Sequence, residues 1–244
     1  MPDMIEPTEL GPNRTGLQRS PLHEEMLSGV DTGRAPPAPP NEQIAALRQS
    51  YIADAEALGT VPPPPTLKGK LGSLMDKATG HRAQVLVDKL AERLAFERGG
   101  SRLYEALLTK AMAVPDPAVD IARLQEIRDQ EVEHANLLAM ALTTLGADPT
   151  AQTPCADLVG VQSFGLLQSV SDPRTTLLQC LSSALAAELI DNAGWDLLAT
   201  LARTSGHEEL AAQCDKALEQ EMEHLATVRG WHETMVLKDG GVAH

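Results

Sequence analysis

The chain has 244 residues, of which 34 are acidic and 20 basic, giving a formal net charge of −14 at pH 7. An acidic surface repels the phosphate backbone, so this composition argues against a nucleic-acid partner. Three widely spaced cysteines without a C-x-x-C pair exclude a zinc ribbon and argue against a disulfide framework. We find no apolar run of about 18 residues and no signal-peptide pattern, so we expect a cytoplasmic protein without a membrane partner.

Residues 1–80 are predicted to form a proline-rich extension with one or two short helices. Residues 1–40 contain many prolines and few large apolar side chains, which is typical of disorder because little burial can offset the ordering entropy. Residues 41–59 have an asparagine start signal, helical apolar spacing and a glycine stop, and are predicted to form a short amphipathic helix. The four prolines at 62–65 indicate a stiff spacer, and residues 66–80 are predicted to form a second short helix.

From residue 81 to 240 the pattern changes to long helices. Apolar residues recur in alternating steps of three and four, the spacing of helices packed in a bundle. The helices are predicted to cover residues of about 83–112, 117–146, 173–204 and 207–237. The third is expected to start at Asp172, as an N-cap followed by Pro173. The predicted fold class is therefore all-α, an antiparallel four-helix bundle with one long crossover, residues 147–172, that can contain a short helix.

The functional signal is a Glu-x-x-His sequence that occurs twice, each time on an apolar stripe. This spacing places a carboxylate and an imidazole one turn apart on one helix face. Glu131 follows Glu97 by 34 residues, and Glu221 follows Glu188 by 33, so the halves match as a duplicated helical hairpin would. The six candidate metal ligands are Glu97, Glu131, His134, Glu188, Glu221 and His224.

These acids stand where a helical bundle is expected to be apolar. Glu188, for example, has leucine and alanine as its stripe neighbours. A buried carboxylate costs several kcal/mol unless it is paired or bound to metal. Four glutamates and two neutral histidines balance the charge of two divalent cations, and oxygen and nitrogen ligands without thiolates favour iron or manganese. We predict a two-metal site rather than a buried ion-pair network; the spacing does not define which glutamates bridge the ions.

The segments LAFERGGSRLYEALL, EVEHANLL, LAAELIDNAGW and EMEHLATV resemble the ferritin-like superfamily. Their symmetrical ligand set is more similar to rubrerythrins, bacterioferritins and manganese catalases than to animal ferritins. The resemblance covers the bundle, and the paired C-x-x-C motifs of the rubrerythrin electron-transfer domain are absent. It implies a ferritin-like antiparallel four-helix bundle with two iron ions, or alternatively two manganese ions, per chain. It also implies oxidation of Fe(II) or reduction of peroxide or O2.

Two further residues are candidates for roles beside the metals. Tyr104 lies seven residues after Glu97, as Trp195 lies seven after Glu188. The resemblance implies that Tyr104 hydrogen-bonds a ligand across the bundle or acts as a redox-active phenol; the alternative is a core tyrosine, and Trp195 is expected to be core packing. Asp191, one turn after Glu188, is a candidate to hold a ligand histidine N–H, or else it faces solvent.

The sequence is compatible with three functions. The first is a redox enzyme of the ferroxidase or peroxidase type, acting on Fe(II), peroxide or O2. The second is a subunit of an iron-storage shell. The third is a non-enzymatic metal-binding stress or scaffold protein whose proline-rich arm recruits a protein partner. In each case we expect a homo-oligomer.

Overall fold

The computed structural model describes residues 41–63 and 83–241, and within these ranges every regular element is a helix. The chain divides into two units between Ala57 and Leu58. The predictions made for residues 1–40 and for the helix at 66–80 lie outside the described residues.

The first described helix, α2 (Asn41–Asp54), confirms a helix in the proline-rich extension. It ends at Asp54, before the predicted stop at Gly59, although Gly59 does adopt a positive φ of 122°. Its side chains Leu47, Tyr51 and Ile52 are more than half exposed. A helix of this length is marginally stable in water on its own.

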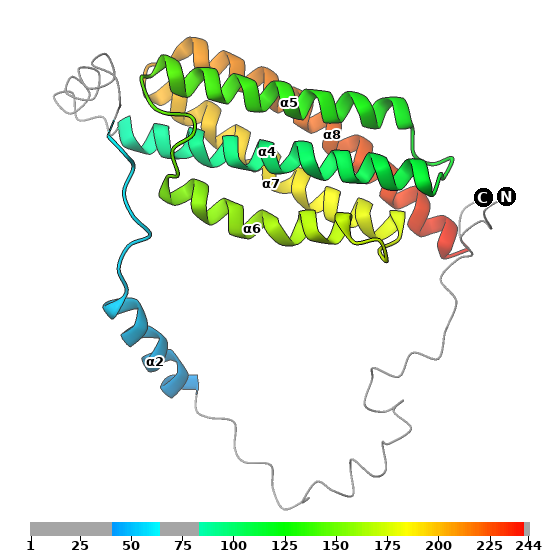
Figure 1. The fold of residues 1–244 in the computed structure, drawn as a ribbon, viewed down its shortest axis with the longest axis horizontal. Coiled ribbons are helices and arrows are strands. Elements are labelled where there is room, and N and C mark those ends of the chain that lie inside the picture. The colour runs from blue at the N-terminus through cyan, green and yellow to red at the C-terminus, as the bar shows by residue number, and fades with distance from the viewer. Residues whose placement is uncertain (1–40, 64–82, 242–244) are drawn as a thin grey trace, which may run out of the picture. The chain divides into compact units, whose positions relative to one another are not determined.

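Four long helices make up the second unit together with a shorter one. They are α4 (Ala83–Ala113), α5 (Ile121–Thr144), α6 (Pro154–Ser171), α7 (Leu177–Thr204) and α8 (Glu208–Asp239). Figure 1 shows the long helices side by side, with α6 along α4 and α7. The hairpins α4–α5 and α7–α8 pack closely, and α4 contacts α7 across them, whereas α5 and α8 contact each other little. The predicted all-α bundle class agrees with this arrangement.

The starts of two helices differ from the predictions. The second long helix begins at Ile121 rather than near 117, because the Asp120 side chain accepts hydrogen bonds from the first free backbone N–H groups. The prediction that Asp172 caps the third helix is wrong. Thr176 caps α7 instead, in a reciprocal pair of hydrogen bonds with Gln179.

Asp172 lies at the other end of this connection, where it closes α6. Its carboxylate accepts hydrogen bonds from the backbone and the side chain of Arg174. The crossover therefore contains an 18-residue helix rather than a short one. This helix buries Ala156, Val159 and Val170 against the bundle.

The core of the bundle consists of two apolar clusters with a polar layer between them. One cluster includes Leu107, Ile127, Leu181 and Val228. The other includes Leu90, Leu138, Leu198 and Ala217. Each long helix contributes to both clusters and has one of the four predicted ligand glutamates near the change from one cluster to the other. The four carboxylates therefore meet at the same level of the bundle.

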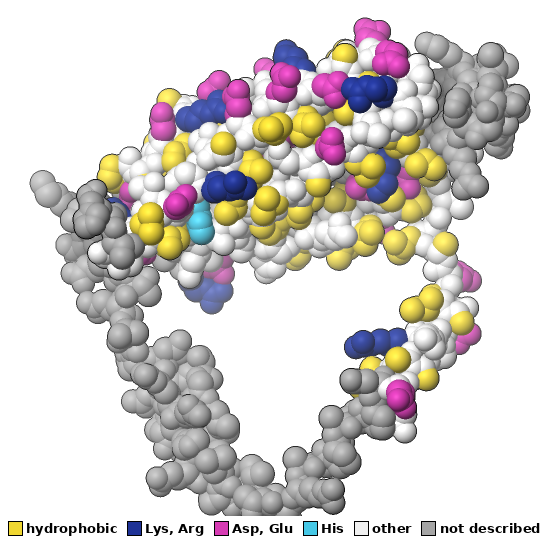
Figure 2. All heavy atoms as spheres, turned by 180° about the vertical axis from the view of Figure 1, so that it is seen from behind, with side chains coloured by type: hydrophobic (Ala, Val, Ile, Leu, Met, Phe, Trp, Pro, Cys, Tyr) yellow, Lys and Arg dark blue, Asp and Glu magenta, His cyan; other side chains and the backbone are white. Residues whose placement is uncertain are grey.

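The surface differs from this core in composition. Figure 2 shows one face on which acidic and basic side chains are interspersed with hydrophobic ones. No helix among the described residues combines the length and apolar character needed to cross a bilayer.

Candidate metal centre

All six predicted ligands lie in the polar layer, and none has an exposed fraction above 2%. Their donor atoms form overlapping groups in which every atom lies within 4.8 Å of the others. One group contains Glu131, Glu188, Glu221 and His224, and a second contains Glu97, His134 and Glu221. A third contains Glu97, Glu131, Glu221 and Asp191.

The three groups overlap at one residue. Glu221 belongs to all of them, Glu97 and Glu131 each belong to two, and Glu188 belongs to one. Each histidine occurs in one group, His224 with Glu188 and His134 with Glu97. Glu221 is therefore the carboxylate that the two histidine-containing groups share.

Glycine makes room for one of these carboxylates. Gly100 is on α4, and a Cβ added there would overlap Oε2 of Glu131. Any larger residue at position 100 would push the Glu131 carboxylate away from its place in the layer.

Each histidine presents Nδ1 to the carboxylates. His134 Nδ1 lies 2.6 Å from Glu221 Oε1, at an angle that does not form a hydrogen bond. His224 Nδ1 lies 3.1 Å from Glu221 Oε2 and 3.4 Å from Glu131 Oε1. Ligands at right angles around an ion at about 2.1 Å are themselves about 3 Å apart, so these contacts suit neighbours in one coordination shell.

The other ring nitrogens are held by two glutamines that the sequence analysis did not identify. His134 Nε2 lies 3.0 Å from Oε1 of Gln220, and His224 Nε2 lies 2.7 Å from Oε1 of Gln130. An amide oxygen only accepts, so it holds the proton on Nε2 and leaves Nδ1 free to bind a cation. The signal is present in the chain, because the repeated motif is QEVEH and QEMEH, one residue longer than Glu-x-x-His.

Replacing either glutamine with leucine is expected to lower the affinity for divalent metal by about 10- to 100-fold, the usual effect of losing such a partner. Gln130→Leu frees the His224 ring, and Gln220→Leu frees His134. Isothermal titration with Mn(II) measures the change. Gln125→Leu, an exposed position on the same helix as Gln130, is the control and should bind as the wild type does. Unchanged affinity in both core variants would contradict the assigned role.

Several buried polar atoms of the layer have no hydrogen-bond partner among the described residues. They include Glu97 Oε2, both carboxylate oxygens of Glu131, Glu188 Oε2, Glu221 Oε1 and His134 Nδ1. Leaving such atoms unpaired is costly, and a cation is the partner they share. The donor set therefore fits divalent cations bound by oxygen and nitrogen.

Two of the remaining carboxylate oxygens are held across the bundle in a matched pattern. Tyr104 donates its hydroxyl hydrogen to Glu188 Oε1, from α4 to α7. Trp195 donates its indole N–H to Glu97 Oε1 at 2.8 Å, from α7 to α4. Trp195 is therefore more than core packing, and the seven-residue offset shared by the two aromatic residues was the sequence signal for this. The Tyr104 hydrogen bond agrees with the first of its two predicted roles; redox activity stays a prediction.

Asp191 is buried, and it does not take the predicted place beside a histidine. Its Oδ1 lies 3.0 Å from Nη1 of Arg93, which also lies beside Glu97. The glutamines occupy the position beside the histidine N–H groups that Asp191 was expected to fill. The spacing placed Asp191 correctly on the buried face, but it did not reveal the arginine that pairs with it.

Without a bound cation, most of the acidic groups in the layer and His224 have raised pKa values. Burial raises the pKa values of Glu97, Glu131 and Glu188 well above the usual range, and neighbouring carboxylates raise them further. Burial lowers the pKa of His224, but Glu131 and Glu221 outweigh this effect and raise it to about 9. Burial raises the pKa of Glu221, whereas its contacts with the two histidines lower it to about 2. In the metal-free protein, bound protons therefore reduce the negative charge of the layer, as bound cations would.

Metal binding is therefore expected to release protons, because a ligand histidine must be neutral and a ligand carboxylate ionised. His224, with a pKa of about 9, is protonated at pH 7 and must lose that proton. Affinity for Mn(II) should rise about tenfold per pH unit for each proton released, over the range below pH 9. Titration in lightly buffered solution with a pH indicator counts the protons. Binding without proton release would contradict the arrangement of donors.

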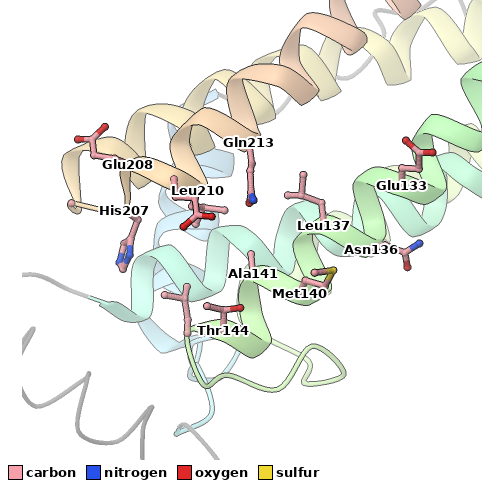
Figure 3. Close-up of a pocket in the computed structure, with 13 residues that line it drawn as sticks. Glu133, Asn136, Leu137, Met140, Ala141, Thr144, His207, Glu208, Leu210 and Gln213 are labelled. Atoms are coloured by element: carbon pink, nitrogen blue, oxygen red, sulfur yellow. The ribbon is translucent and has the colours of Figure 1, made fainter.

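A separate cavity of about 750 Å³ lies where α5 and the start of α8 diverge. Figure 3 shows Met140 and Thr144 on one side and His207, Glu208 and Leu210 on the other. None of the six predicted ligands lines it. His207 stands at the N-terminal end of α8.

The comparisons with known proteins add no relative. No protein-family model matches the chain, and no curated protein or solved structure shows significant similarity to it. The site is therefore interpreted from its own chemistry.

Proposed function

We propose that the chain is a ferritin-like dinuclear metal protein that binds two iron ions, or alternatively two manganese ions, and acts as a redox enzyme. The observation that carries this proposal is the pair of donor sets, each with one histidine, that share Glu221 within one buried layer. The antiparallel bundle with its long crossover supports a ferritin-like fold, in which such a layer is characteristic.

The residues have separable tasks in this proposal. Glu221 would contribute to both ion positions, and Glu97, Glu131 and Glu188 with the two histidines would complete the ligand set. When bound, two adjacent redox-active ions would supply electron transfer to peroxide or O2, or from Fe(II). Tyr104 holds its proton toward Glu188, and burial together with that carboxylate keeps the pKa of the phenol well above its usual value, so it acts as a fixed donor. The two apolar clusters exclude water from both sides of the layer.

The test is metal content together with turnover. The full chain is purified from cells grown with iron and with manganese, and metal per chain is measured. Fe(II) is then added without oxygen, followed by peroxide or O2, while absorbance and oxidant consumption are recorded. The proposal predicts about two metals per chain and an oxidant-dependent absorbance change. Two bound metals without any turnover would contradict the redox role.

Observations on α2 favour a second candidate for the extension. Its exposed Leu47, Tyr51 and Ile52 suit an arm that recruits a protein partner. Deleting residues 1–80 separates the possibilities: activity that survives while assembly or localisation is lost assigns the arm to interaction. The storage alternative predicts a large shell, so a native mass of one or two subunits would exclude it.

A further inference from the structure

A buried arginine stands directly behind the candidate metal centre. Arg93, on α4, has an exposed fraction of 4% and is the one Lys or Arg side chain in the core among the described residues. Its Nη1 lies 3.0 Å from Asp191 Oδ1, and its Nε lies 3.5 Å from Glu97 Oε1. Its guanidinium carbon lies 4.2 Å from the ring centroid of Phe96. A fixed positive charge therefore touches a predicted ligand.

The neighbouring helix is shaped to receive this side chain. Gly194 lies one turn after Asp191 on α7, and a Cβ added at position 194 would overlap Nη1 of Arg93. The same nitrogen donates to the backbone oxygens of Asp191 and Ile190, at 3.3 and 3.5 Å. The guanidinium group thus occupies the space on α7 that is left by the absence of a side chain at Gly194.

The pair departs from the internal symmetry of the bundle. Arg93 lies four residues before the first-half glutamate, where the second half has Ala184. Asp191 lies three residues after the second-half glutamate, where the first half has Gly100. Neither charged residue is therefore repeated in the other half of the bundle. The two opposite charges occur only as a pair with each other.

Charge explains why both residues are present together. Asp191 adds a fifth carboxylate to the layer, within 4.8 Å of Glu97, Glu131 and Glu221. Arg93 cancels that charge, so the five carboxylates, the guanidinium and two divalent ions sum to zero. Without Arg93 the loaded layer would carry a net negative charge, and without Asp191 a net positive one. In a buried site an uncompensated charge acts strongly on a nearby ion.

We propose that Arg93 and Asp191 form a charge-compensating pair that sets the affinity of the centre for divalent ions, each residue acting in the opposite direction. Arg93 weakens cation binding and Asp191 strengthens it. Both are positioning residues that act through the ligand carboxylates. The inference rests on the proposed dinuclear site and concerns what tunes it.

Titration of the full chain with Mn(II) at pH 7.5, with free Mn(II) measured by electron paramagnetic resonance, tests this pair. Arg93→Met is expected to bind Mn(II) about tenfold more tightly than wild type, and Asp191→Asn about tenfold more weakly. The double variant should return to within about threefold of wild type, because the two charges are removed together. Arg93→Lys keeps the charge and should also bind like wild type. Arg98→Met, at an exposed position on the same helix, is the control.

The outcomes separate this inference from the proposed function. If both single variants bind more weakly and the double variant more weakly still, the pair only supports the packing, and the inference is overturned. If Arg93→Met does not fold, Arg93→Lys and Asp191→Asn still decide: weak binding by Arg93→Lys, or unchanged binding by Asp191→Asn, overturns it. If the wild type binds no Mn(II) or other divalent metal, the proposed function fails, and the inference fails with it.

Discussion

Replacing Glu221 with alanine is expected to abolish loading of both metal ions, because this carboxylate belongs to every donor group in the layer. Glu188→Ala should remove dinuclear loading but leave the position formed by Glu97 and His134. Both variants should keep their helical content, since each removes a polar group from a bundle held by two apolar clusters. Metal per chain after desalting and far-ultraviolet circular dichroism measure the two effects.

The control for these two variants is a substitution on α8, two residues after Glu221. Glu223→Ala changes an exposed glutamate of the same EMEH sequence and should bind two ions as the wild type does. Equal metal content in Glu221→Ala and Glu223→Ala would show that the ligand assignment is wrong.

The free energy of unfolding is expected to depend on pH in opposite directions with and without bound metal. In the metal-free protein, folding raises the pKa values of Glu97, Glu131 and Glu188 above the usual range. It raises that of Asp191 to about 6 and that of His224 from 6.5 to about 9. A group with a raised native pKa stabilises the fold below its unfolded pKa, and this contribution is lost as pH rises through the native value.

The free energy of unfolding of the metal-free protein should therefore fall as pH rises from about 4.5 to 9. His224 alone accounts for roughly 3 kcal/mol of this fall, between pH 6.5 and 9. Glu221, with its lowered pKa, contributes stability that is lost only below about pH 4.5. With Mn(II) in excess the trend should reverse, because fewer protons then compete with the ion. Urea unfolding at several pH values, with chelator and with Mn(II), measures both trends; parallel trends would contradict the account.

The sequence predicted well which polar residues are buried together, because burial of an acid is chemically improbable without a partner. Two Glu-x-x-His motifs and two lone glutamates on apolar stripes define one level of the bundle, and the structure places all six residues there. The periodicity likewise predicted the long helices, since it directly reflects which face each helix buries.

Other features depended on contacts between distant parts of the chain. Gln130 and Gln220 precede the motif glutamates, where a glutamine is equally suited to the surface, and only the antiparallel placement of α5 and α8 brings each to the opposite histidine. The burial of Arg93 could not be predicted from the sequence, because the space for its side chain is provided by Gly194, 101 positions away. The start of α7 was misplaced because a proline after an aspartate is compatible with both a helix start and a turn.

The central claim is that two cations lie among these six side chains. Crystals of the full chain grown with Mn(II), with data collected at a wavelength where manganese scatters anomalously, test it most directly. The account predicts two anomalous peaks about 3.5 to 4 Å apart, with Glu221 between them and one histidine at each. No peak within the layer, or a single ion bound elsewhere on the protein, would contradict it.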